Sequence, residues 1–235
     1  NGTLLTESIA DTLAEWRPFG IEISLYGATQ ETYERVTGVP GSFARCMRGI
    51  ELLLERNLPL QLKTVLLTIN QHELAQMKQF SESLGKEFRF DPLINAGIDC
   101  NLNPTQYRLD PEQIITYEVE DPERAKAWPK AYEEFKVFEK SYSLMYCCGA
   151  GGVGFHIDAF GMLSLCMTAR NPSYDLRKGS FKEGWENFFP ELLALEYSPQ
   201  FACSGCELQL VCAQCPAIGL TELGNPEARV PFVCQ

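Results

Sequence analysis

The sequence predicts an α/β fold followed by a small cysteine-rich domain. Short β-rich runs alternate with amphipathic helices up to about residue 95, and eight of the ten cysteines fall at or after Cys147. With 45% hydrophobic and 22% charged residues, the chain can bury a core and is neither disordered nor fibrous. Strands separated by helices of this length imply right-handed crossovers and therefore a parallel sheet.

Three strands are predicted in the first part, over residues 20–25, 59–67 and 87–91. Thr6, Ser42 and Asn70 are placed to cap the helices around these strands. Asn1-Gly2 is typical of a turn that follows a strand, so we expect the chain to be a piece of a longer protein. Residues 96–146 form a connector with four prolines, in which a helix is expected to begin at Pro111 and residues 121–142 are helix-prone.

Charge and hydropathy argue against two classes of partner. The chain has 31 acidic and 20 basic residues, a net charge of −11, whereas a phosphate backbone needs clustered cations. No run of 18 or more apolar residues occurs. We therefore expect no nucleic-acid partner and no membrane partner. Because no signal peptide is visible, we expect a cytoplasmic protein.

Polar residues follow the predicted strands at their carboxyl ends, where parallel sheets and barrels place their chemistry. Ser24 ends the first strand, Asn70 follows the second, and Arg89 and Asp91 end the third. Taken by themselves, these residues are explained more simply by capping and loop chemistry, and for Arg89 and Asp91 the alternative is a local ion pair.

The cysteine spacing after residue 147 is the most specific signal in the chain. Cys147 and Cys148 are adjacent and precede a glycine-rich turn and a predicted hairpin that ends near Cys166. A run Cys203-x2-Cys206-x5-Cys212-x2-Cys215 follows, and Cys234 nearly closes the sequence. Cysteine pairs of this spacing turn two sulfurs onto one metal centre. Iron–sulfur clusters, structural zinc and disulfides all remain possible on spacing alone, although only five residues separate the two pairs, fewer than in most zinc ribbons.

The pattern resembles the SPASM domain of radical SAM enzymes, a group that includes anaerobic sulfatase maturases and peptide maturases. That group has a Cys, a spacer, Gly-x4-Cys, then Cys-x2-Cys-x5-Cys-x3-Cys and a final Cys. The matching residues are Cys148, Gly161, Cys166, Cys203, Cys206, Cys212, Cys215 and Cys234. The one departure is the spacing of two residues, rather than three, between Cys212 and Cys215. Residues 23–27, 34–38 and 41–43 are similar to barrel segments of the same enzymes.

The resemblance implies two auxiliary [4Fe-4S] clusters. One would bind Cys148, Cys166 and Cys215, with Cys147 or an open iron position completing it. The other would bind Cys203, Cys206, Cys212 and Cys234. The implied fold is a partial (β/α) barrel, the C-terminal half of a radical SAM barrel, over residues 1–100, a helical linker over 101–146 and the SPASM domain over 147–235.

The resemblance also implies roles outside the cysteines. Ser24 would hold the ribose of S-adenosylmethionine. Beyond the resemblance, we expect Arg35 to neutralise the carboxylate of this cosubstrate, because that pairing needs planar donors, and we expect Arg89 and Asp91, at the carboxyl end of a strand, to contact cosubstrate or substrate. The implied activity is modification of a peptide or protein by a 5′-deoxyadenosyl radical, with a flavodoxin or ferredoxin as electron donor. No Cys-x3-Cys-x2-Cys loop occurs in the 235 residues, so we expect this chain to be inactive alone.

Two alternatives to that function stay open. The first is a zinc-stabilised module that docks a peptide without catalysis. The second is a radical SAM enzyme that acts on a small molecule.

Overall fold

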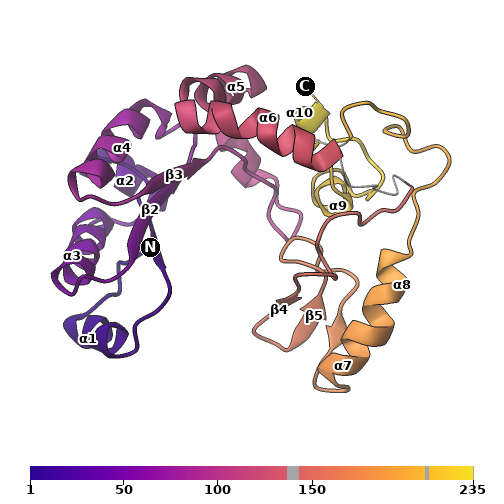
Figure 1. The fold of residues 1–235 in the computed structure, drawn as a ribbon, viewed down its shortest axis with the longest axis horizontal. Coiled ribbons are helices and arrows are strands. Elements are labelled where there is room, and N and C mark those ends of the chain that lie inside the picture. The colour runs from indigo at the N-terminus through magenta and orange to yellow at the C-terminus, as the bar shows by residue number, and fades with distance from the viewer. Residues whose placement is uncertain (137–142, 210–211, 235) are drawn as a thin grey trace. The chain divides into compact units, whose positions relative to one another are not determined.

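The computed structural model describes residues 1–136, 143–209 and 212–234 (Figure 1). The chain divides into two compact units. Unit 1 is Asn1–Ile94 with Tyr107–Asp110, and unit 2 is Asn95–Gln106 with Pro111–Gln235. Residues 137–142 of the predicted linker lie outside the described residues. The division predicted at residues 100 and 146 stays a prediction.

Unit 1 is built on a three-stranded parallel sheet with the order β1-β2-β3. The strands are β1 Ile21–Ser24, β2 Leu60–Val65 and β3 Phe88–Asp91. The helices are α1 Glu7–Glu15, α2 Gln30–Thr37, α3 Ser42–Glu55 and α4 Leu74–Ser83, with a 3₁₀ turn Gln71–Glu73 before α4. The parallel sheet predicted from the alternation of strands and helices is therefore confirmed, and Thr6 caps α1 as predicted.

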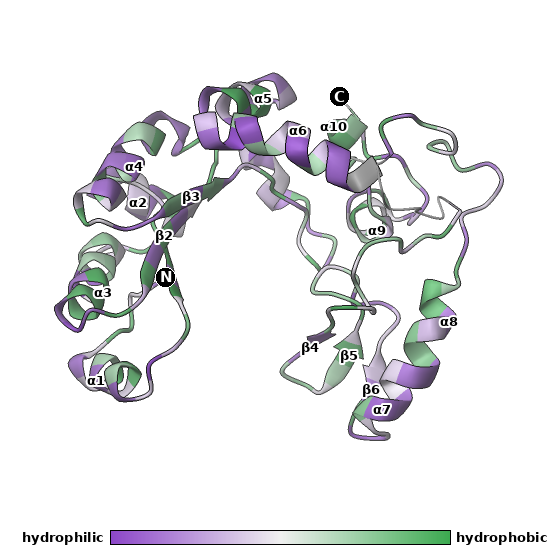
Figure 2. Ribbon diagram, viewed as in Figure 1, coloured by the Kyte–Doolittle hydropathy of each residue, from purple (hydrophilic) through white to green (hydrophobic). Residues whose placement is uncertain are grey.

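The two faces of this sheet differ in polarity, because alternate residues of a strand point to opposite faces. One face carries Ile23, Leu62 and Phe90, which are buried, and the first two belong to the core of the unit. The other face carries Glu22, Lys63 and Arg89, with Glu22 paired to both cations. The helices around the sheet contain both hydrophobic and hydrophilic residues (Figure 2). Parallel sheets are usually covered on both faces by apolar contacts, so the charged face is suited to water or a polar ligand.

Two of the predicted helix caps are wrong. Gly41, at φ +73°, precedes α3, and Ser42 is its first residue, with its hydroxyl 2.8 Å from the Thr37 hydroxyl. The Asn70 side chain makes no capping bond and is instead buried between the loops that follow β1 and β2. Both polar side chains satisfy tertiary partners, which a sequence pattern does not reveal.

Gly49 marks the close approach of α3 to the first turn of the chain. A Cβ at this position would lie 2.4 Å from the Gly2 carbonyl oxygen, a backbone atom. We expect Gly49→Ala to lower the free energy of unfolding by about 1 kcal/mol or more, since overpacking outweighs the helix preference of Ala. Urea denaturation measures the loss. Gly20→Ala is the control because nothing lies within 4 Å of its added Cβ; equal losses in both variants contradict this account.

Unit 2 combines helices with a small antiparallel sheet of order β4-β5-β6. The strands are β4 His156–Ile157, β5 Met162–Ser164 and β6 Tyr174–Asp175. The helices are α5 Pro111–Glu120, α6 Pro122–Lys136, α7 Phe181–Glu183, α8 Phe189–Leu193, α9 Pro216–Leu223 and α10 Pro231–Cys234, with a π-helical turn Gly184–Phe188 between α7 and α8. A 3₁₀ turn spans Asn103–Tyr107. The helix start at Pro111 and the hairpin are as predicted, and every helix in the described ranges is too short or too polar to cross a bilayer.

Candidate metal centre

The β4–β5 hairpin positions Cys166. The Asp158 carboxylate accepts the backbone N–H of Met162 at 2.9 Å within the turn, and this bond lowers the pKa of Asp158. Gly161 adopts φ +79°, a left-handed conformation that the turn needs and that glycine adopts without strain. Cys166 follows β5, and its Sγ accepts the backbone N–H of Ala169 at 3.2 Å. The sulfur is thus held at the edge of the unit 2 core.

Cys215 lies near Cys166 and Cys148. It precedes α9, and its sulfur accepts backbone hydrogen bonds from Ala217 and Ile218 in the first turn of that helix. Burial raises the pKa of Cys215, and the charges of Cys166 and Cys148 raise it further. Cys166 and Cys215 also pack against the same core cluster of unit 2. A bound cationic metal centre would instead lower the pKa of these thiols, because positive charge stabilises thiolates.

A second group of cysteines lines a cavity of about 250 Å³. Its members are Cys203, Cys206, Cys212 and Cys234. Burial raises the pKa of Cys203, and the charges of the other three raise it further. The short α10 brings Cys234 back to this cavity from the far end of the chain.

Cys147 and Cys148 also line this cavity. The charge of Cys148 in addition raises the pKa of Cys215. Tyr197 also lines this cavity: burial raises its pKa, and the charges of Cys215, Cys147 and Cys203 raise it further. Its ring stacks on Phe201 with centroids 3.6 Å apart. The structure therefore places six of the eight predicted ligands around one cavity and packs the other two, Cys166 and Cys215, against one core, and the role of all eight as ligands stays a prediction.

The donor set consists of cysteine thiols, which as thiolates bind both zinc and iron–sulfur clusters. Each of the ten cysteines is a free thiol. Within the described ranges, no group of three or more Cys, His, Asp or Glu side chains is arranged to hold one metal ion. Zinc draws four thiolates to about 2.3 Å from one point, whereas a four-iron cube with its sulfides holds four thiolates further apart. Which of the two centres these cysteines hold stays a prediction.

The residues predicted to contact the cosubstrate lie on unit 1. Ser24 ends β1 and shares the charged sheet face with Arg89 and Asp91 of β3. Arg89 is mostly exposed and pairs with Glu22 at 2.9 Å, and among the described residues no ion pair joins Arg89 to Asp91. Asp91 instead accepts the Leu93 N–H at 2.9 Å. Arg35 is exposed in the last turn of α2, away from the strands themselves.

Glu73, which the sequence reasoning missed, anchors the loop that follows β1. Its buried carboxylate accepts the Ala28 N–H at 2.7 Å and the hydroxyls of Thr29 and Thr32 at 2.6 Å each. Burial raises the pKa of Glu73, but these hydrogen bonds outweigh burial, and the net shift is downward. Nothing in the sequence marks Glu73 except its place shortly after a strand end.

Asn70 supports the same loop. Its side-chain amide donates to the carbonyl oxygens of Tyr26 at 3.1 Å and Val65 at 3.0 Å. Two buried polar residues after β2 therefore fix the backbone after β1, next to Ser24.

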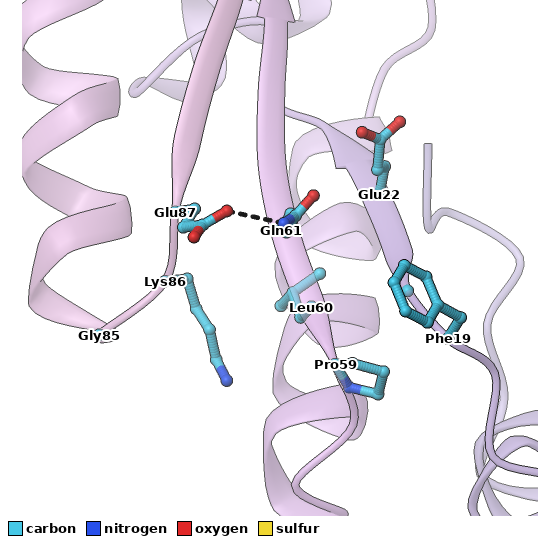
Figure 3. Close-up of a pocket in the computed structure, with 9 residues that line it drawn as sticks. Phe19, Glu22, Pro59, Leu60, Gln61, Gly85, Lys86 and Glu87 are labelled. Atoms are coloured by element: carbon cyan, nitrogen blue, oxygen red, sulfur yellow. Dashed lines mark hydrogen bonds between the residues drawn. The ribbon is translucent and has the colours of Figure 1, made fainter. Parts of the chain in front are cut away.

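A hollow of about 720 Å³ opens at the opposite, amino end of the strands (Figure 3). Phe19, Leu60 and Lys86 contribute to its wall, and Gln61 donates to Glu87 across it at 2.7 Å. Chemistry on parallel sheets and barrels lies at the carboxyl ends of strands. This hollow is therefore not the candidate site.

Comparison with curated proteins finds relatives along nearly the whole chain, while no family model matches. An AdoMet-dependent heme synthase of Methanosarcina barkeri is 26% identical over 99% of this chain and 72% of its own length. A second, of Oleidesulfovibrio alaskensis, is 26% identical over 99% of this chain and 65% of its own length.

Comparison with solved structures finds the same fold in anSMEcpe, an anaerobic sulfatase maturase. Native anSMEcpe with bound AdoMet matches with a TM-score of 0.64 at 19% identity, covering 100% of this chain and 69% of that chain. The same protein with AdoMet and the Kp18Cys peptide matches with a TM-score of 0.64 at 17% identity. The relatives and the shared fold confirm the resemblance to radical SAM enzymes: this chain is similar in sequence to AdoMet-dependent heme synthases and in fold to anSMEcpe.

Proposed function

We propose that this chain is the part of a radical SAM enzyme that holds two auxiliary [4Fe-4S] clusters. Unit 1 is then a partial (β/α) barrel and unit 2 contains a SPASM domain. The observation that carries the proposal is the gathering of Cys203, Cys206, Cys212 and Cys234 around one cavity. Cys148, Cys166 and Cys215 would hold the first cluster, with Cys147 as its candidate fourth ligand. Such a cluster, when bound, supplies or accepts one electron at a potential that the surrounding protein sets.

Metal analysis separates this proposal from the zinc alternative. After purification without oxygen, the chain is expected to be brown and to contain iron and acid-labile sulfide. A colourless protein that contains zinc without sulfide contradicts the cluster proposal and supports a docking module without catalysis.

The proposed substrate is a peptide or protein, and the proposed electron donor is a flavodoxin or ferredoxin. The peptide complexes of anSMEcpe support a peptide substrate through shared fold. The sequence relatives favour a second candidate, a tetrapyrrole, because they are named heme synthases and are 26% identical to this chain. Titrating the cluster-loaded full-length protein with heme, followed by the heme absorption band, distinguishes them: saturable binding supports the second candidate, and its absence leaves the peptide.

Ser24 is proposed to hold the ribose of S-adenosylmethionine from the carboxyl end of β1. In the full-length enzyme we expect Ser24→Ala to weaken cosubstrate binding by about 1 kcal/mol, the typical worth of one hydrogen bond, or roughly fivefold in Kd. Isothermal titration calorimetry measures the change. Ser8→Ala, on the exposed surface of α1, is the control. Unchanged affinity in Ser24→Ala removes Ser24 from the binding site.

A further inference from the structure

The cavity lined by Cys203, Cys206, Cys212 and Cys234 also has a cation in its wall, Arg229. The cations Arg56, Arg124 and Arg177 each pair with a carboxylate, whereas the described residues provide none for Arg229. Arg229 therefore brings an exposed, positively charged side chain to the wall that the four cysteines line.

Gln214 fixes the backbone on both sides of Arg229. Its Nε2 donates to the Ala228 carbonyl oxygen at 2.8 Å, and its Oε1 accepts the Val230 N–H at 3.1 Å. The Gln214 side chain therefore makes the hydrogen bonds of the Ala228 carbonyl and the Val230 N–H, which in a sheet a neighbouring strand would make. Val230 is buried, which adds a second anchor beside Arg229.

The same residue ties Arg229 to the cysteine run. Gln214 lies between Cys212 and Cys215, and its backbone N–H donates to the Cys212 sulfur at 3.4 Å. Gln214 thus connects the Cys212–Cys215 segment to the backbone that carries Arg229.

We propose that Arg229 tunes the redox potential of the second auxiliary cluster and that Gln214 holds it in place. This inference rests on the proposed function because it requires that cluster. Reduction adds one electron to a [4Fe-4S]2+ core and gives [4Fe-4S]+, so that the charge of the core with four thiolates changes from −2 to −3. A fixed cation stabilises the more negative state. Arg229 therefore raises the potential.

The test is a redox titration of the chain reconstituted with iron and sulfide, with dithionite as the electron source and electron paramagnetic resonance as the readout. In Arg229→Met we expect one reduction step to move to lower potential and the other to stay. At the wild-type midpoint, the ratio of reduced to oxidised cluster is expected to fall three- to tenfold, where tenfold is 59 mV for one electron. Arg229→Lys keeps the charge and most of the potential. Lys182→Met removes an exposed cation of α7, which does not line the cavity, and leaves both steps unchanged.

The outcomes separate the two proposals. If the wild-type chain shows no cluster, the proposed function is wrong. If Arg229→Met keeps its iron and both potentials, the cluster assignment stands and the role of Arg229 is wrong. If Arg229→Met loses iron, Gln214→Ala decides: a lower potential with iron retained supports the inference, and an unchanged potential overturns it.

Discussion

Replacing Cys203 by Ser is expected to remove about half of the bound iron, because one of two clusters loses a ligand while the other keeps all of its own. Cys203 is the natural choice, since the charges of Cys212, Cys234 and Cys206 all act on it. Cys166→Ser, in the other group, is expected to remove about half as well, and the double variant nearly all. Colorimetric iron and sulfide assays on proteins reconstituted in parallel measure the loss.

Cys100→Ser provides the control for this experiment. Cys100 is exposed and belongs to neither group of cysteines. Its replacement is expected to leave the iron content unchanged. Full iron content in Cys203→Ser removes Cys203 from the ligand set, and complete loss of iron in that single variant contradicts the presence of two separate clusters.

Replacing Glu73 by Gln is expected to destabilise the chain by about 2–3 kcal/mol. The carboxylate is buried and accepts hydrogen bonds from Ala28, Thr29 and Thr32, whereas a Gln amide offers one acceptor oxygen and turns an NH₂ group toward these donors. Chemical denaturation at pH 7 measures the loss. The exposed Glu82 at the end of α4 gives the matched control, Glu82→Gln, for which we expect a change near zero.

The pH dependence gives this prediction a second readout. The pKa of Glu73 is lowered in the folded chain, so its stabilising contribution is complete above the pKa of an unfolded Glu, about 4.3, and disappears as the pH falls through the lower folded value. Glu73→Gln is therefore expected to have a lower free energy of unfolding than the wild type at pH 7 and nearly the same free energy of unfolding in acid. If the free energy of unfolding of Glu73→Gln falls short of the wild-type value by the same amount at pH 7 and in acid, the stabilising role of the ionised Glu73 carboxylate is contradicted.

The parallel sheet was predictable because its signals are local. Alternation of buried and exposed residues in 21–24 and 60–65, together with helices between the strands, leaves few topologies. The division of the cysteines into two ligand sets came from the resemblance to SPASM domains and not from their spacing, and it stays a prediction.

Tertiary partners account for what the sequence missed. Ser42 and Asn70 read as caps, yet each bonds to a residue outside its own helix start. Glu73, Gln214 and Arg229 carry no motif, because their importance depends on loops that only the fold brings together. Arg89 pairs with Glu22 of a strand that is not its direct neighbour, a contact that depends on the geometry of the sheet face.

The most direct measurement is the stoichiometry of iron and acid-labile sulfide in the anaerobically prepared chain. Two cubane clusters predict about eight of each per polypeptide, with an absorption shoulder that bleaches on reduction by dithionite. Zinc in place of iron, or disulfides among the same cysteines, would contradict the central claim that these cysteines hold two [4Fe-4S] clusters.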